Sequence, residues 1–215
     1  MKHLLTILIT ILTIGVVTGQ IGEANAWYSV SGVKPIHQQW NVHYTVQYRS
    51  EALKPTPGMF FILGGMNYQL PDKHWKVGAS YYLIEKRGSN SNLESSYEAI
   101  HFIREEVAYQ YFWRNIKISH KLRLEQVWGL QADLFQQVRL VNSFILPLTR
   151  EQKLYFNAYS EIFFRYDGTG YNRNRVFAGV QYRFTRPLSI QVGFLSEIFE
   201  KHTTKNLFVG IHQSL

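Results

Sequence analysis

Strict alternation of apolar and polar residues is the feature that most constrains the fold of this chain. Residues 40–49 place Trp, Val, Tyr, Val and Tyr on one face and Asn, His, Thr, Gln and Arg on the other. The same period of two recurs at 116–125, 176–184 and 188–194. Successive side chains of a β-strand point to opposite faces, so the pattern predicts strands with one apolar and one polar side.

Ten segments of this kind predict an all-β fold in which consecutive strands pair antiparallel. The expected strands are 40–49, 58–70, 75–86, 97–113, 116–128, 134–147, 153–166, 173–185, 188–199 and 206–215. Residues 27–34 belong to none of these strands. They could form a periplasmic lead-in, a segment that enters the lumen, or part of a strand pair that would raise the count to twelve. With an even count, both chain ends would lie on the same side of a barrel.

Two architectures fit such strands: a soluble barrel or sandwich with its polar face in water, and a membrane barrel with its polar face in the lumen. Most segments reach the roughly nine to eleven residues of a membrane strand, beyond the five or six usual in soluble sheets. Aromatic residues at the expected strand ends also favour a membrane. The sequence therefore favours an antiparallel transmembrane β-barrel of about ten strands, although alternation alone does not say which face is outside.

The N-terminal residues predict export. Lys2 and His3 precede an apolar run over residues 4–17, and Ala24, Asn25 and Ala26 form a small-x-small cleavage site. The run is about fourteen residues long, which is short of the roughly twenty that a retained membrane anchor needs. We therefore expect a signal peptide at 1–26 and a barrel domain at 27–215, located in the outer membrane of a Gram-negative bacterium.

Composition limits the chemistry that the chain can perform. The 215 residues include no cysteine, which excludes a disulfide scaffold and thiolate metal sites. The sequence contains no His-Glu-x-x-His, P-loop or Gly-x-Gly-x-x-Gly motif, so we expect no metal and no cofactor. The formal charge is +8, but the cations are spread singly along the strands, and we expect no nucleic-acid partner.

The expected partners are instead those of the outer membrane. Basic residues at the predicted outer rim would meet the phosphates of outer-membrane lipid and lipopolysaccharide: Lys54, Lys86, Arg87, Arg173, Lys201 and Lys205. Leu207, Val209, Ile211 and Leu215 continue the alternation to the last residue. Such an end predicts recognition of the C-terminal strand by the barrel assembly machinery.

Five pieces of the chain, taken in their order and spacing, resemble a bacterial outer-membrane barrel family of unknown function, the domain of unknown function numbered 2490. The pieces are residues 40–49, 119–126, 159–163, 174–182 and 191–194. The chain departs from the pattern at Ser160, where Asn is expected before the glutamate. The resemblance covers nearly the whole mature chain and implies a single outer-membrane barrel, without implying an activity.

Charged residues gather on the predicted lumenal face, where cations outnumber carboxylates. The inward set is Arg49, Lys117, Lys121, Arg123, Glu125, Arg139, Glu161, Arg165, Arg175, Arg183 and Glu197. Because a buried charge must be paired, we expect a lumenal charge network of Arg123, Glu125, Arg139, Glu161, Arg165, Arg175 and Arg183. The role would then be structural, or a narrow pathway for small solutes and anions, although barrels of this size are usually filled.

The alternative function is an outer-membrane hydrolase that acts on lipid or peptide at the extracellular rim. Its candidate residues are His43, His101, His120 and His212 with Ser80, Ser119, Ser160, Glu125 or Glu161. His120 shares a face with Leu122 and Leu124 and should point outward, so it cannot activate the inward Ser119. We assign no catalytic residue from the sequence.

Overall fold

The structure is a computed structural model that describes residues 25–50, 58–87, 97–129, 135–166 and 170–214. These ranges contain no helix and form eleven strands. The strands are β1 (Asn25–Pro35), β2 (Trp40–Ser50), β3 (Met59–Gln69), β4 (Trp75–Arg87), β5 (Tyr97–Trp113), β6 (Ile116–Gly129), β7 (Phe135–Pro147), β8 (Leu154–Arg165), β9 (Gly170–Arg183), β10 (Leu188–Phe199) and β11 (Thr203–Ser214).

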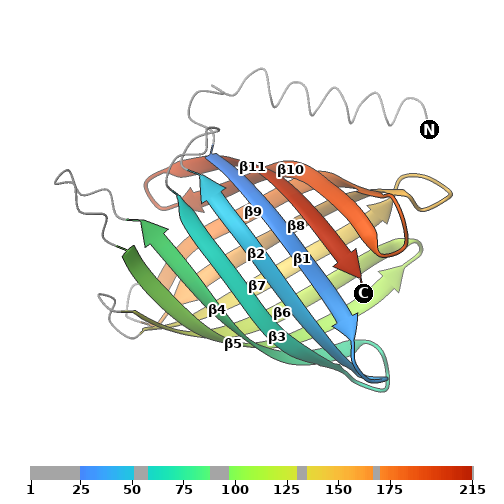
Figure 1. The fold of residues 1–215 in the computed structure, drawn as a ribbon, viewed down its shortest axis with the longest axis horizontal. Coiled ribbons are helices and arrows are strands. Elements are labelled where there is room, and N and C mark those ends of the chain that lie inside the picture. Colours follow the sequence, from blue (N-terminus) through green and yellow to red (C-terminus); the bar gives the residue numbers. More distant parts are fainter. Residues whose placement is uncertain (1–24, 51–57, 88–96, 130–134, 167–169, 215) are drawn as a thin grey trace.

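The strands close into a single barrel, in which each one pairs antiparallel with its sequence neighbours (Figure 1). The ring is completed by β1 and β11, which pair in parallel, with Trp27 opposite Phe208 and Ser31 opposite His212. Directions alternate around an antiparallel ring, so an odd number of strands requires one parallel pair. The ten expected segments correspond to β2 through β11, and the all-β barrel is confirmed.

The strand count and the placement of the chain ends differ from the sequence expectation. Residues 27–34 belong to β1, so the described part of the chain has eleven strands, neither ten nor twelve. Asn25 lies at the end of the barrel where connections 51–58 and 88–96 leave the strands, here called the long-loop end. Ser214 lies at the opposite, short-turn end. The expectation that both chain ends lie on the same side is therefore wrong. The additional strand β1 runs from the long-loop end to the short-turn end, so the first described residue lies at the end opposite the start of β2.

The outer face of the barrel is apolar and the inner face is polar. Val42, Leu124 and Val192, which the alternation assigned to the apolar face, point outward with exposed fractions of 37%, 47% and 39%. Many large apolar side chains share that outer surface, among them Tyr28, Val30, Phe60, Ile62, Tyr81, Ile103, Val107, Leu122, Leu140, Phe144, Val176, Phe194, Ile198 and Ile211. The polar side chains that alternate with them fill the lumen.

Two apolar clusters pack inside the barrel toward the long-loop end. One consists of Phe61, Leu63, Tyr82, Phe102 and Val127, and the other of Trp27, Phe177 and Leu195. Paired glycines of β9 and β10, Gly179 and Gly193, make room for the Phe177 ring, since a Cβ at either would lie within 2.7 Å of its Cζ atom. The charged residues lie at mid-barrel, next to the clusters. A pocket of about 410 Å³ lies beyond them, toward the short-turn end.

Candidate functional site

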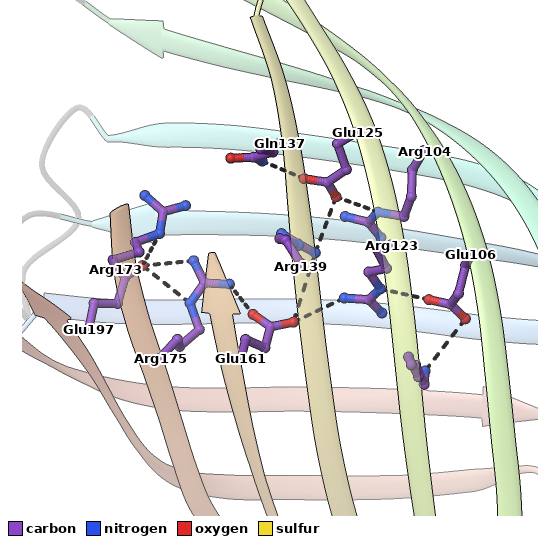
Figure 2. A network of polar contacts seen from close by, with 11 residues as sticks. Arg104, Glu106, Arg123, Glu125, Gln137, Arg139, Glu161, Arg173, Arg175 and Glu197 are labelled. Atoms are coloured by element: carbon purple, nitrogen blue, oxygen red, sulfur yellow. Dashed lines mark hydrogen bonds and ion pairs between the residues drawn. The ribbon is translucent and has the colours of Figure 1, made fainter. Parts of the chain in front are cut away.

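A continuous network of ion pairs crosses the middle of the lumen (Figure 2). Its most buried carboxylate is Glu125 of β6, with an exposed fraction of 1%. Arg104 of β5 donates from Nε to Glu125 Oε1 at 2.7 Å, and Arg139 Nη2 of β7 lies 3.3 Å from the same oxygen. Gln137 donates to the other carboxylate oxygen. Glu125 is thus bound from both neighbouring strands, because the register places Arg104 and Gln137 directly opposite it.

Glu161 of β8 joins the two halves of this network. Arg123 Nη1 donates to Glu161 Oε1 at 3.0 Å, and Arg175 Nη1 donates to Oε2 at 2.7 Å. Arg139 Nη2 lies 3.8 Å from Oε1, so it contacts two carboxylates. Arg175 in turn donates from Nη2 to Glu197 at 2.7 Å. Glu161 is therefore a junction between strands that are not neighbours in the sheet.

Two flanking carboxylates extend the network across the barrel. Glu106 accepts from Arg123 Nε at 2.6 Å and lies 3.7 Å from Lys121 Nζ. Glu197 lies 3.8 Å from Arg173 Nε. Among the described residues the network comprises four carboxylates and six cations, which leaves a formal excess of two positive charges. Aromatic faces lie beside several of the guanidinium groups, as where Arg173 stacks 4.3 Å from the Phe163 ring.

The structure joins five of the seven residues expected to form the lumenal network, namely Arg123, Glu125, Arg139, Glu161 and Arg175. The other two are placed elsewhere. Arg165 lies at the long-loop end over the Phe135 ring at 4.0 Å, and Arg183 lies at the short-turn end over Tyr155 at 4.8 Å. The length of the strands separates these two arginines from the middle of the barrel.

Three network members were absent from the inward set expected from the sequence. Arg104 and Glu106 lie on the inward face of β5, and the alternation of residues 97–113 could have identified both. Arg173 was expected at the outer rim, but β9 begins at Gly170, three residues earlier than expected, and Arg173 pairs inward with Glu197. Among the other rim cations, Lys201 and Lys205 are exposed, and Lys54 lies outside the described residues.

The histidines proposed for a hydrolase are divided between the two faces. His101 and His120 lie on the outer face, where they contact Tyr81 and Asn142 at 2.6 and 2.7 Å. His43 points inward and contacts Asn67 Nδ2 at 3.1 Å. In the part of the chain that the structure describes, none of these three forms a hydrogen bond or an ion pair with a serine or a carboxylate.

His212 contacts a serine that the sequence did not single out. Ser31 Oγ lies 2.5 Å from His212 Nδ1, and His212 Nε2 lies 2.7 Å from Gln191 Oε1. A carboxamide oxygen only accepts hydrogen bonds, so Nε2 bears the proton and Nδ1 can accept the Ser31 hydroxyl. This contact spans the parallel seam between β1 and β11, and local sequence patterns give no signal for it because 181 residues separate the two side chains.

The described residues that bound the pocket between the charge network and the short-turn end include five cations and one carboxylate. Its cations are Lys76, Arg104, Lys117, Lys121 and Arg123, and its carboxylate is Glu106. Small residues on the inward face, such as Gly78 and Ala108, leave this space open. Within the described ranges no group of three or more His, Asp or Glu could hold a metal ion. No described helix is long and apolar enough to cross a membrane.

Comparison with known proteins places this barrel in a family without an assigned activity. No curated protein and no solved structure matches the chain. The family model described as "Protein of unknown function (DUF2490)" matches residues 24–208, which span every described strand except the end of β11. The chain therefore belongs to the DUF2490 family, and the membership expected from its sequence is confirmed.

Proposed function

We propose that this protein is an outer-membrane β-barrel of a Gram-negative bacterium, with a closed lumen and a structural role. The observation that carries the proposal is the division of the wall into an apolar outer face and a charged inner face. Such a surface is unfavourable in water and suits a bilayer. The strands have 11 to 17 residues, which is enough for tilted membrane strands.

The filled interior favours a structural role over an open pathway for anions. The charge network crosses the lumen at mid-barrel, and two apolar clusters pack between it and the long-loop end. Barrels of this size are usually filled by side chains, whereas aqueous channels occur at about sixteen strands. The turns of outer-membrane barrels are short on the periplasmic side, so the pocket would face the periplasm.

Membrane fractionation and electrophoresis test the location. We expect the protein in the outer-membrane fraction, and we expect the folded barrel to migrate differently from the heat-denatured chain in detergent gels. Recovery as a soluble periplasmic protein would refute the proposal. Planar-bilayer recording tests the closed lumen: we expect no steady conductance, and a steady anion-selective current would replace the structural role with a pathway.

Outer-membrane lipid, lipopolysaccharide and the barrel assembly machinery follow from this location as proposed partners. Lys201 and Lys205 are exposed near the long-loop end, where lipopolysaccharide phosphates would lie. The outward side chains of β11, including Ile211, continue the apolar belt to the C-terminal strand. Crosslinking from β11 to the assembly machinery during export would test that contact, and efficient assembly of a chain with a scrambled β11 would contradict it.

A hydrolase is the second candidate, and the Ser31–His212–Gln191 contact is the observation that favours it. The Ser31 hydroxyl contacts the His212 ring, whose other nitrogen contacts the Gln191 amide, so a nucleophile, a base and an orienting group are connected. Ser31 also borders the pocket. This site lies toward the short-turn end, not at the rim where the sequence suggested one. Labelling by a fluorophosphonate probe, lost in Ser31→Ala, would support hydrolysis, and equal labelling of both proteins would refute it.

A further inference from the structure

Two lysines in the pocket have no compensating charge. Lys76 of β4 and Lys117 of β6 are both half-buried, border the same pocket and interact electrostatically with each other. No carboxylate in the described part of the chain forms an ion pair with either one. Among the described residues that line the pocket, the one carboxylate belongs to Glu106, which is bound to Arg123 and Lys121.

Neutral donors without partners lie next to these cations. Ser119 lies between Lys117 and Lys121 on the inward face of β6, and Ser143 lies opposite it on β7. Neither serine hydroxyl forms a hydrogen bond within the described residues, although both border the pocket. Two ammonium groups and two hydroxyls therefore border one space, and none of the four forms an ion pair or a hydrogen bond with a described side chain.

The register brings these groups together. Lys76 lies opposite Ala108 on β5, and Ala108 lies opposite Lys121 on β6, so the three form one inward row. Because Ala108 is small, the space between the two lysines of this row stays open. The row borders the charge network on one side, and Lys117 lies beyond it toward the short-turn end.

We propose that this pocket binds a small ligand through a phosphate group, with Lys76 and Lys117 as its principal ligands. A phosphate monoester has a charge of about −1.5 to −2 at pH 7 and accepting oxygens for several donors, which matches two unpaired ammonium groups and two free hydroxyls. The volume of about 410 Å³ lies in the range of small-molecule sites. The charge network and the two apolar clusters fill the lumen between this pocket and the long-loop end, so the pocket suits binding and not passage.

The proposal goes beyond the structural role and does not require it, because the pocket lies inside the barrel in detergent as well as in a membrane. The phosphate could belong to a soluble monoester or to a lipid headgroup. Titration calorimetry of the folded protein in dodecyl maltoside distinguishes the two. The soluble probes are inorganic phosphate and glycerol 3-phosphate, the lipid probe is dihexanoyl phosphatidate, and sodium chloride at equal ionic strength is the reference.

The test variants are Lys76→Gln, Lys117→Gln and the double variant, and the matched control is Lys153→Gln. Lys153 is exposed in the connection between β7 and β8 at the short-turn end, outside the pocket lining. We expect each single lysine variant to weaken phosphate binding by about tenfold, as expected for losing one charge-assisted hydrogen bond. The double variant should weaken it further, and Lys153→Gln should leave it unchanged. Each variant should show the heat-modifiable migration of the native barrel, since removing one of two like charges relieves repulsion.

Each possible result of the titration either supports the proposal or overturns it. Lysine-dependent binding of inorganic phosphate or glycerol 3-phosphate supports a soluble ligand, and lysine-dependent binding of dihexanoyl phosphatidate alone supports a headgroup. No binding above the chloride reference, or equal binding by the double variant and Lys153→Gln, would overturn it. As a second measurement, Lys117→Gln should raise the unfolding midpoint without phosphate, and a lower midpoint would show that the lysine has a stabilising partner and overturn the proposal.

Discussion

Glu161 is the position where the lumenal charge network can be tested most directly. The residue is 6% exposed, and its carboxylate accepts one charge-assisted hydrogen bond from Arg123 and one from Arg175. In Glu161→Gln one oxygen becomes an NH₂ donor that faces an arginine N–H, so one of these bonds is lost. Each such bond contributes about 1.5–3 kcal/mol.

The change also removes one of the negative charges that neutralise the buried guanidinium groups. The formal excess of the network rises from two to three positive charges, because three carboxylates then face six cations. Removing one partner of a buried ion pair costs about 3–5 kcal/mol. We therefore expect Glu161→Gln to lower the free energy of unfolding by about 3–5 kcal/mol.

The assay is equilibrium urea unfolding of the barrel in lipid vesicles, followed by tryptophan fluorescence. Glu105→Gln is the matched control, because Glu105 is exposed on the outer face of the same barrel and forms no ion pair or hydrogen bond among the described residues. Arg123→Gln combined with Glu161→Gln restores the excess of two charges. The double variant should recover part of the loss, with a coupling energy of about 0.5–3 kcal/mol.

An unchanged unfolding midpoint for Glu161→Gln would refute this reasoning. If that variant also abolished a measurable hydrolysis of lipid or peptide, Glu161 would be a catalytic carboxylate, because removing such a group commonly leaves stability unchanged while activity disappears. A loss in Glu105→Gln as large as in Glu161→Gln would mean that the effect is not due to the lumenal contacts.

Two further pairs of substitutions test the faces of the wall and the packing inside it. Val180→Arg on the outer face of β9 should cost about 2–4 kcal/mol in bilayers, whereas the inward Gln181→Arg should cost less, and equal losses in urea unfolding would place the register one residue off. Gly193→Ala should cost about 1–3 kcal/mol, because its methyl group would lie 2.5 Å from a strand carbonyl oxygen and 2.6 Å from the Phe177 ring. Gly64→Ala, with no atom within 4 Å of the new Cβ, should leave the midpoint unchanged or slightly raised, and equal effects of the two alanines would contradict the packing.

The sequence by itself determined the strands β2 through β11 to within about three residues. Alternation is a local property of the chain, because each side chain's face follows from its own position in the strand. For the same reason the adjacent Glu105 and Glu106 of β5 lie on opposite faces, and the structure exposes the first and pairs the second with Arg123.

Only the tertiary structure decided how the barrel closes. β1 contains Gly32 and a weak alternation. It pairs with its sequence neighbour β2 along one edge, and along the other edge it closes the ring with β11, at the other end of the sequence. Its parallel pairing sets the strand number at eleven, moves Asn25 to the long-loop end and brings Ser31 to His212. No local pattern contains this information, because the contact depends on the whole ring being present.

The tertiary structure also decided which charges meet. Alternation placed Arg123, Glu161 and Arg165 on one face, but the distance along the strands separates Arg165 from the others. The same geometry leaves Lys76 and Lys117 beside one pocket, where no described carboxylate forms an ion pair with either lysine. The sequence shows on which face of its strand each charged side chain lies. Which charges pair depends on their positions along the barrel axis and on the register of strands that are distant in the chain.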